Sequence, residues 1–232
     1  MIEARGLTKR FGGVIALDGV SFRLPRGSRT ALLGANAAGK TTLLSLLSTL
    51  ATPSGGEARI DSFDVAAAPP ALRKRLGVMT HQPMVYEELS AEENLTLFAR
   101  LYEVRDAAGR IEELLRAVGL WLRRDEPAAV LSRGAHQRLA VARAMVHRPD
   151  VLLLDEPETG LDEDGLAMLD ELALRSEDAG LTVLAATHRR ERVASWADGT
   201  IVLERGRVVE DASARPDAAS PASPASSLRV VQ

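Results

Sequence analysis

The chain has 232 residues, 46% of them hydrophobic, which is enough to bury the core of one large α/β domain or two small ones. A formal net charge of -3 argues against a general attraction to nucleic acid or to an anionic membrane surface, and the lack of cysteine excludes disulfides and thiolate metal sites. Because the first residues lack the apolar core of a signal peptide and no apolar run approaches the ~20 residues that span a bilayer, we expect a soluble, cytoplasmic protein.

The amino-terminal part of the chain is expected to begin as a small antiparallel β region. Apolar alternation indicates three strands, at residues 2–7, 20–24 and 29–33. Turn-forming residues lie between them, at Gly12-Gly13 and Pro25-Arg26-Gly27. Residues 39–50 have the apolar spacing of a helix and follow the third strand directly, so we expect a strand, a glycine loop and a helix in succession.

The middle of the chain is expected to be mostly helical. Apolar spacing predicts helices at residues 91–103, 107–118 and 132–147. The second of these is expected to begin after Asp106 as its N-cap and to end at Gly119. We therefore place a helical subdomain at about residues 84–148.

The remaining folded part alternates strands and helices, which is typical of a three-layer α/β fold. Residues 151–154 form an unbroken apolar run, of the kind that a parallel sheet buries on both faces. A helix at 163–178 and strands at 181–186, 200–204 and 207–210 are expected to follow. The folded domain then covers residues 1–211, and the Ala/Ser/Pro-rich residues 212–232 are expected to be a disordered tail.

Residues 34–41, GANAAGKT, match the phosphate-loop pattern. Gly34 and Gly39 let the backbone curl so that successive N–H groups point at phosphate oxygens, and the following helix presents its positive end to the same anions. Lys40 supplies a charge for the β and γ phosphates, while Thr41 is a ligand for Mg²⁺. Only Lys9, Lys40 and Lys74 among the 29 basic residues are lysines, so a glycine turn that merely caps a helix is the weaker interpretation.

The segment VLLLDEP at 151–157 places two acids at the carboxyl end of a buried strand, where open α/β sheets have their ligand crevice. Asp155 is expected to hold Mg²⁺ through water. Glu156 is expected to face the attacking water as general base or as the group that orients it. Such a strand end is often only a solvated turn, and it is the phosphate loop elsewhere in the chain that favours the functional interpretation.

Two further segments are candidates on weaker grounds. At 131–138 the chain has LSRGAHQR, in which Ser132 is expected to cap a helix and Gly134 to allow another group to approach closely. His188 follows a strand end and is placed to donate a hydrogen bond to a γ-phosphate, although a lone histidine there is more often structural. The other histidines have no metal-ligand spacing, and we expect no zinc site.

Taken in order, these segments resemble the ABC ATPase family, over about residues 2–210. The resemblance implies a P-loop NTPase that binds ATP and Mg²⁺ and closes as a head-to-tail dimer, in which the signature segment of one subunit covers the ATP of the other. The nucleotide-binding residues that it implies are Phe11, which stacks on adenine, and Gly34, Ala35, Asn36, Ala37, Ala38, Gly39, Lys40, Thr41 and Thr42. The implied signature segment comprises Leu131, Ser132, Arg133, Gly134, Ala135 and Gln137. Asp155 and Thr41 are then the magnesium groups, Glu156 and His188 the catalytic residues, and Gly160, Leu161 and Asp162 a dimer-contact loop.

The chain departs from the family pattern at several positions. Ala35 replaces a usual proline and Ala37 a usual glycine; if residue 37 needs a positive φ, alanine costs about 1 kcal/mol or somewhat more. Arg133 replaces the first glycine of the signature and Ala135 its glutamine, which removes a polar contact and adds a bulky cation. The metal-sensing glutamine of the family aligns with His81, and Gln82 lies one residue late, so either residue is the candidate.

The resemblance implies the ATP-hydrolysing subunit of a membrane exporter, bound on the inner face of the cell membrane to a separate transmembrane subunit. The segment THQPMVYEELSAEENLTLFARLY looks like the ATPase of the haem exporter used in cytochrome c maturation, although general drug or lipid exporters share most of it. Two alternatives remain: a soluble non-transport ABC ATPase, and a weakly active regulatory cassette in a heterodimer. The ATPase dimer is either a homodimer or a heterodimer, and no nucleic-acid partner is expected because the sequence has no basic stripe.

Overall fold

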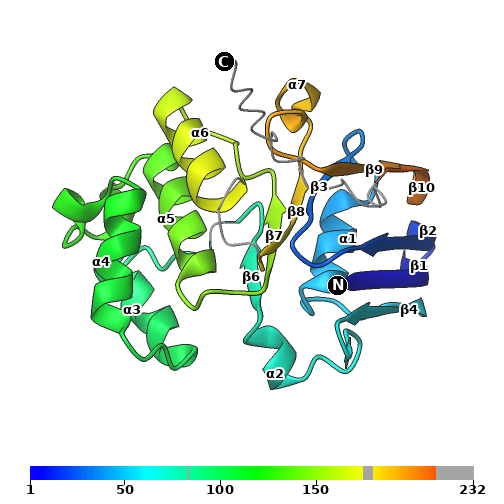
Figure 1. Ribbon diagram of the computed structural model, residues 1–232, viewed down its shortest axis with the longest axis horizontal. Helices are drawn as coiled ribbons and strands as arrows, with labels where there is room; N and C mark the ends of the chain where they lie inside the picture. Colours follow the sequence, from blue (N-terminus) through cyan, green and yellow to red (C-terminus); the bar gives the residue numbers. More distant parts are fainter. Residues whose placement is uncertain (83, 175–179, 213–232) are drawn as a thin grey trace, which may run out of the picture.

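The computed structural model describes residues 1–82, 84–174 and 180–212. Two sheets lie side by side in it, with a cluster of helices beyond one of them (Figure 1). The larger sheet has six strands in the order β10-β9-β3-β8-β7-β6, and all are parallel except β10, which pairs antiparallel with β9. Its strands are β3 (Arg29–Leu33), β6 (Leu76–Met79), β7 (Val151–Asp155), β8 (Thr182–Ala186), β9 (Gly199–Glu204) and β10 (Arg207–Asp211).

The smaller sheet is antiparallel and has the order β2-β1-β4-β5. Its strands are β1 (Ile2–Phe11), β2 (Val14–Leu24), β4 (Gly55–Ile60) and β5 (Phe63–Asp64). Helix α1 (Lys40–Leu47) lies between the two sheets, and its leucines share one buried cluster with both of them. This arrangement fixes the start of α1, and hence the loop before it, relative to the ends of the central strands.

Strand β7 shows why a strand of the central sheet has an unbroken run of apolar residues. Val151 and Leu153 face the cluster around α1, whereas Leu152 and Leu154 face the cluster on the other side of the sheet, and all four are fully or almost fully buried. Both faces of the sheet are therefore covered, as expected for parallel strands. The architecture is the three-layer α/β fold, with an antiparallel β region and a helical part, that the sequence predicts.

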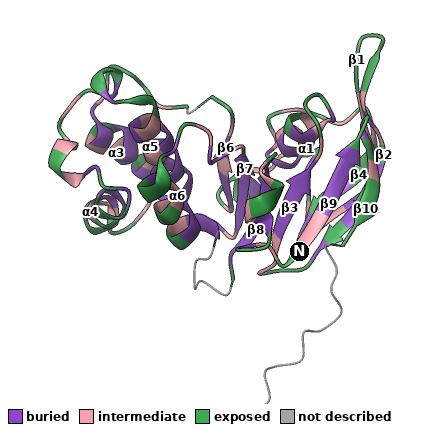
Figure 2. Ribbon diagram, turned by 90° about the horizontal axis from the view of Figure 1, so that it is seen from above, coloured by how far each residue is buried: buried purple, intermediate pink, exposed green. Residues whose placement is uncertain are grey.

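The helical part lies on the far side of the central sheet, and its inner surfaces are buried (Figure 2). Between β6 and β7 the described chain forms α3 (Ala91–Leu101), α4 (Ala107–Ala117) and α5 (Arg133–Met145), with two short 3₁₀ turns at Trp121–Arg123 and Ala128–Val130. Side-chain caps begin all three helices: Ser90 in a capping box with Glu93, Asp106, and Ser132. Each cap satisfies a backbone N–H that the first helical turn leaves free.

The expected elements differ from the observed ones mainly at their ends. The first two strands continue into a hairpin that turns at Gly12-Gly13. The helix expected at 163–178 is observed as α6 (Glu163–Leu169), followed by a π-helical turn at Asp170–Leu174, and residues 175–178 lie outside the described residues. Strands β4, β5 and β6 and the short helices α2 (Pro70–Arg73) and α7 (Arg190–Val193) were not anticipated. Strand β5 and the two helices have only two to four residues, whereas β4 (GGEARI) and β6 (LGVM) contain glycines that interrupt their apolar pattern. Residues 213–232, expected to be a disordered tail, lie outside the described residues.

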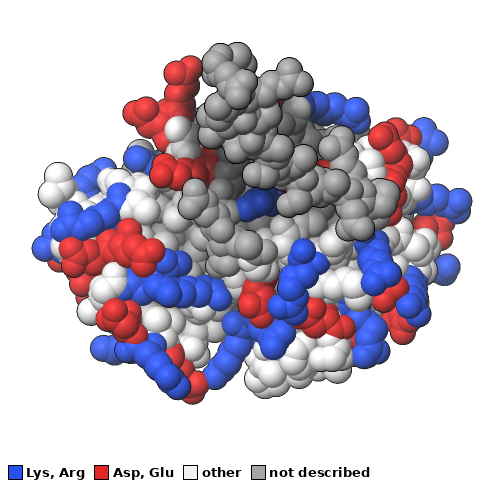
Figure 3. Space-filling view, in the orientation of Figure 1, with Lys and Arg blue, Asp and Glu red and all other residues white. Residues whose placement is uncertain are grey.

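The distribution of charged side chains on the surface agrees with the small net charge of -3. Basic and acidic side chains are interspersed over the face shown in Figure 3 and do not separate into one basic stripe there. Within the described part of the chain, no helix is both long enough and apolar enough to cross a bilayer.

Candidate active site

The glycine loop joins β3 to α1 and depends on its two glycines. Gly34 has φ 154° and Gly39 has φ 108°. A Cβ on Gly34 would lie 2.5 Å from the carbonyl oxygen of Leu203, and one on Gly39 would lie 2.8 Å from that of Ala16. Both distances are shorter than a carbon and an oxygen tolerate, so these positions accept no side chain without a shift of the backbone. The loop is thus fixed against β2 and the turn after β9.

Ala37 adopts the left-handed conformation that its position in the loop requires, with φ 62°. An L-residue with a Cβ costs about 1 kcal/mol there relative to glycine. The backbone at Ala35, Asn36 and Ala37 is exposed, whereas Ala38 is buried and its carbonyl accepts a hydrogen bond from Gly206 N. The exposed part of the loop is therefore supported from beneath, which keeps it curled despite the strained alanine.

The ammonium of Lys40 lies inside this curl. Its Nζ donates to the carbonyl oxygens of Gly34 at 2.8 Å and Ala35 at 3.1 Å, and the side chain is only 6% exposed. The described chain therefore encloses a positive charge within a ring of backbone dipoles at the positive end of α1. This combination is suited to an anion with several oxygens.

Asp155, at the end of β7, lies across from Thr41 at the start of α1. Its carboxylate accepts a hydrogen bond from the Thr41 hydroxyl, yet its Oδ2 is buried and has no partner among the described residues. Burial raises the pKa of the Asp155 carboxyl above its ordinary value, and the neighbouring Glu156 charge adds to the rise. The Thr41 hydrogen bond and the electrostatic interactions with His81 and Lys40 lower the pKa of Asp155 and so act in the opposite direction.

The two candidates for the metal-sensing position both line the same cleft. This cleft, of about 250 Å³, is bordered by Thr41, Asp155, His81 and Gln82 among others. His81 also lines a second cleft of about 680 Å³ together with Asp155 and Glu156, and it influences the pKa of Asp155. Of the two side chains, His81 is therefore the one that the fold brings to both acids.

The Asp155 carboxylate is expected to destabilise the nucleotide-free chain. A carboxyl whose folded-state pKa is raised contributes stability at acid pH that is lost as the pH rises through that pKa. Asp155→Asn is therefore expected to raise the unfolding midpoint at neutral pH, with a difference from wild type that narrows at acid pH. Thermal unfolding across this pH range, without nucleotide or Mg²⁺, measures both effects, and a variant less stable than wild type at neutral pH contradicts the argument.

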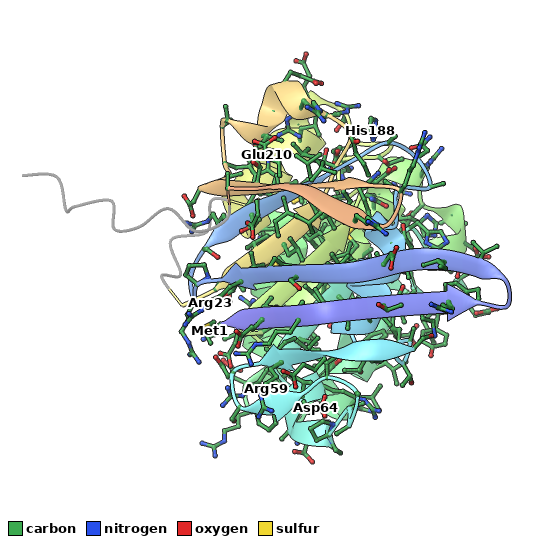
Figure 4. All side chains as sticks on the ribbon, turned by 90° about the vertical axis from the view of Figure 1, so that its right-hand side faces the viewer. Met1, Arg23, Arg59, Asp64, His188 and Glu210 are labelled. Carbon is green, nitrogen blue, oxygen red and sulfur yellow. The ribbon has the colours of Figure 1, made fainter. Side chains whose placement is uncertain are left out.

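Glu156 and His188 meet at the ends of β7 and β8. His188 Nδ1 lies 3.6 Å from Glu156 Oε1, and both side chains reach solvent, at 54% and 33% exposed. Glu156 has φ 50°, an unusual conformation for a residue with a side chain, and its N–H donates to Ala186 O at 2.9 Å. In Figure 4, His188 lies on the side toward which the β1–β2 hairpin points, opposite Met1 and Arg23. Phe11, 55% exposed, lies at the turn of that hairpin.

The segment 131–137 lines neither cleft that borders the glycine loop, that with Thr41 or that with Gly34 to Ala38. Its Arg133 and Gln137 instead line the cleft of about 680 Å³ that contains Asp155 and Glu156 of the same chain. The side chains of Leu131, Ala135 and Gln137 are buried in their own chain, so the segment exposes chiefly Ser132 and Arg133. Ser132 caps α5 by accepting from Ala135 N at 3.2 Å, as expected.

The expected close approach to Gly134 is made by the loop at Gly160. A Cβ on Gly134 would lie 3.0 Å from Gly160 O, and one on Gly160 would lie 3.2 Å from Arg133 Nε. The predicted signature segment and the predicted dimer-contact loop are therefore packed against each other within one chain. In that loop Asp162 caps α6 by accepting from Gly165 N, and Leu161 is almost buried.

Sequence reasoning missed two buried polar residues beside the acids. Glu158 and Thr187 are each 4% exposed, and the Thr187 hydroxyl donates to Glu158 Oε1. Thr187 precedes His188 and Glu158 lies two residues after Glu156, but pairing the two requires knowing that β7 and β8 are neighbours.

Comparison with known proteins agrees with this geometry. The family model described as ABC transporter matches residues 17–159. The daunorubicin/doxorubicin resistance ATP-binding protein DrrA of Streptomyces peucetius is 37% identical over 212 residues, which is 90% of this chain and 64% of that relative, so the chain spans less than two thirds of it. The ABC transporter ATP-binding protein NatA of Bacillus subtilis is 34% identical over 216 residues, or 90% of this chain and 88% of NatA.

Solved structures show the same fold. The dimeric ATP-binding cassette MJ0796, in a post-hydrolysis state bound to ADP and Pi, aligns with a TM-score of 0.81 and 26% identity over 91% of this chain and 97% of that one. An ATP-binding subunit of an ABC transporter aligns with a TM-score of 0.84 and 30% identity, over 90% of this chain and 88% of that chain. The fold, the P-loop geometry and these relatives together establish that the chain belongs to the ABC transporter family, as an ATP-binding subunit with an ABC ATPase domain.

Proposed function

We propose that this chain is the ATP-hydrolysing subunit of an ABC exporter. The observation that carries the proposal is the convergence of three strand ends: the glycine loop after β3, His188 after β8, and Asp155 with Glu156 at the end of β7. These strands are neighbours in the central sheet, and open α/β sheets bind ligands at this edge. Lys40 then holds the β and γ phosphates, and Phe11 stacks on the adenine.

Hydrolysis is assigned to Glu156 and His188. Glu156 is partly exposed and faces the cleft, where it accepts a proton from the attacking water or orients that water. His188 lies beside it and donates to the oxygens of the γ-phosphate, on which negative charge grows as the bond breaks. Gly34 to Thr42 supply backbone N–H groups and hydroxyls to the same phosphates.

The donor set at Thr41 and Asp155 fits Mg²⁺. Hard divalent cations take oxygen ligands, and the buried Asp155 Oδ2 is a carboxylate oxygen that no described protein group satisfies. Thr41 and Asp155 would hold the ion, with His81 favoured over Gln82 as the adjoining sensor residue. When bound, the ion neutralises charge on the β and γ phosphates.

We further propose that two cassettes close head to tail over two ATP molecules. Ser132, Arg133 and Gly134 supply the face that covers the nucleotide of the other subunit, and Gly160, Leu161 and Asp162 contact it from the side. That MJ0796, a cassette of the same fold, has been solved as a dimer supports dimerisation. The dimer is either a homodimer or, because Arg133 and Ala135 depart from the family's signature, a heterodimer in which a second, different cassette supplies the signature segment.

The export substrate is proposed to be a drug-like molecule carried by a separate membrane-spanning subunit, which would hold this chain at the inner face of the membrane. The names of DrrA relatives, which specify daunorubicin and doxorubicin resistance, support this class of substrate. Haem export for cytochrome c maturation rests only on the sequence around residues 80–102, and none of the relatives named above refers to haem. A soluble non-transport ATPase is disfavoured by the same names.

One deletion strain separates these possibilities. Loss of the gene is expected to increase sensitivity to doxorubicin and to raise its accumulation in cells, while covalently attached c-type haem stays normal. Complementation by the wild-type gene should restore efflux, and the Glu156→Gln gene should not. Loss of c-type cytochromes with unchanged drug accumulation would instead assign haem export, and no change in either would favour a non-transport or regulatory role.

A further inference from the structure

A buried hydrogen bond joins the two loops that carry the candidate catalytic pair. Glu158 lies two residues after Glu156, and Thr187 lies one residue before His188. Both side chains are 4% exposed, and the Thr187 hydroxyl donates to Glu158 Oε1. The small cavity beside them is otherwise lined by Pro157, Leu174, Ala185 and Trp196 and by Arg192, whose guanidinium pairs with Asp170. A hydrogen bond in such surroundings is costly to lose, because water does not readily replace either partner.

The Thr187 end of this bond fixes the backbone around His188. Thr187 Oγ1 accepts from Arg189 N at 3.0 Å, so one hydroxyl contacts both Glu158 and the residue that follows His188. The backbone N–H of Thr187 donates to Leu32 O at 3.1 Å, at the end of the strand that leads into the glycine loop. His188 is therefore held on both sides by contacts of a single threonine.

The Glu158 end is equally constrained. Gln137 Nε2, at the start of α5, lies 3.1 Å from Pro157 O and 3.4 Å from Glu156 O, and donates toward both carbonyls. Leu161 N donates to Glu158 O at 3.2 Å, so the backbone from 156 to 161 is fixed from both directions. The Thr187 hydroxyl donates its one proton to Glu158 Oε1 and accepts from Arg189 N–H with a lone pair.

We propose that Glu158 is a positioning residue for ATP hydrolysis. Through the Thr187 hydroxyl it couples the loop of Glu156 to the loop of His188, and so maintains the 3.6 Å approach between His188 Nδ1 and Glu156 Oε1. The inference rests on the proposed function, in which these two side chains act on water and phosphate. It adds that their relative position is set by a buried bond that touches neither nucleotide nor metal.

The test compares two matched pairs of variants in the purified full chain. Glu158→Leu and Thr187→Val remove the bond with little change in volume, whereas Glu158→Gln and Thr187→Ser keep an acceptor oxygen and a hydroxyl. We expect the first two to lower kcat by about 10- to 100-fold without a change in ATP affinity, because small misplacement of reacting groups has effects of this size. The conservative variants are expected to retain most activity, and the Glu158→Leu/Thr187→Val double variant should be no slower than either single one.

The concentration of chains that bind ATP is measured by calorimetry, and each rate is divided by that concentration. A loss of folded protein then does not lower kcat. Wild-type kcat in Glu158→Leu overturns the proposal, as does a Glu158→Gln variant as slow as Glu158→Leu. If Glu158→Leu fails to fold, the Thr187 variants replace it. Wild-type kcat in Thr187→Val, or a Thr187→Ser variant as slow as Thr187→Val, then overturns the proposal. Glu156→Gln is assayed in parallel: wild-type hydrolysis there refutes the assignment of Glu156, whereas a slow Glu156→Gln with a normal Glu158→Leu refutes only the positioning role.

Discussion

Glu156→Gln is expected to bind ATP as wild type does and to hydrolyse it at least about 100-fold more slowly. The amide is nearly the same size as the carboxylate, so it preserves the contacts of the loop but accepts no proton from water. The unusual φ of Glu156 and its bond to Ala186 O involve only the backbone and persist in the variant. Calorimetric ATP titration together with phosphate release measures the two halves of this prediction.

The same variant tests the composite site. Uncleaved ATP is expected to hold two Glu156→Gln chains together, so size-exclusion chromatography should show a dimer with ATP and a monomer without it. Ser132→Arg in the Glu156→Gln background is the matched control, because Ser132 is exposed, belongs to the proposed covering face and lines neither cleft that borders the glycine loop in its own chain. It should bind ATP and remain monomeric. A Glu156→Gln chain that stays monomeric with ATP at high concentration would favour a heterodimer in which another cassette supplies the working signature.

Lys40→Ala is expected to weaken ATP binding by roughly 10- to 100-fold, the effect of losing a hydrogen bond to a charged group of about 1.5–3 kcal/mol. The lost group is the buried ammonium that the carbonyls of Gly34 and Ala35 hold inside the loop. Without it the loop retains its backbone N–H groups but no full positive charge to oppose the phosphates. ATP titration by calorimetry in the presence of Mg²⁺ measures the change.

Lys74→Ala is the matched control for this change. Lys74 is half exposed and forms an ion pair with the exposed Glu103, so its removal should alter neither ATP affinity nor, to a measurable degree, stability. Equal ATP affinity in Lys40→Ala and wild type would refute the assignment of residues 34–42 as the phosphate site.

The local elements of the site could be read from the sequence because each depends on neighbouring residues. Gly34 and Gly39 between an apolar strand and an apolar helix predict the loop, since only glycine tolerates that backbone close to other chain segments. The unbroken apolar run before Asp155 predicts a strand buried on both faces and hence acids at its carboxyl end. Ser132 and Asp106 predict helix starts, since their oxygens bond N–H groups only three residues ahead.

Tertiary structure alone decided which of these elements meet. The order β3-β8-β7 brings His188 to Glu156 and pairs Glu158 with Thr187, residues that lie about thirty positions apart in the chain. The packing of α5 also turns Gln137 onto the Pro157 carbonyl and sets Arg133 against Gly160 of the same chain, contacts that the family resemblance, which implied a role toward the nucleotide of a second subunit, did not predict. Periodicity and capping report on contacts within a few residues, whereas strand order is fixed by burial of both sheet faces at once, a condition that no local segment encodes.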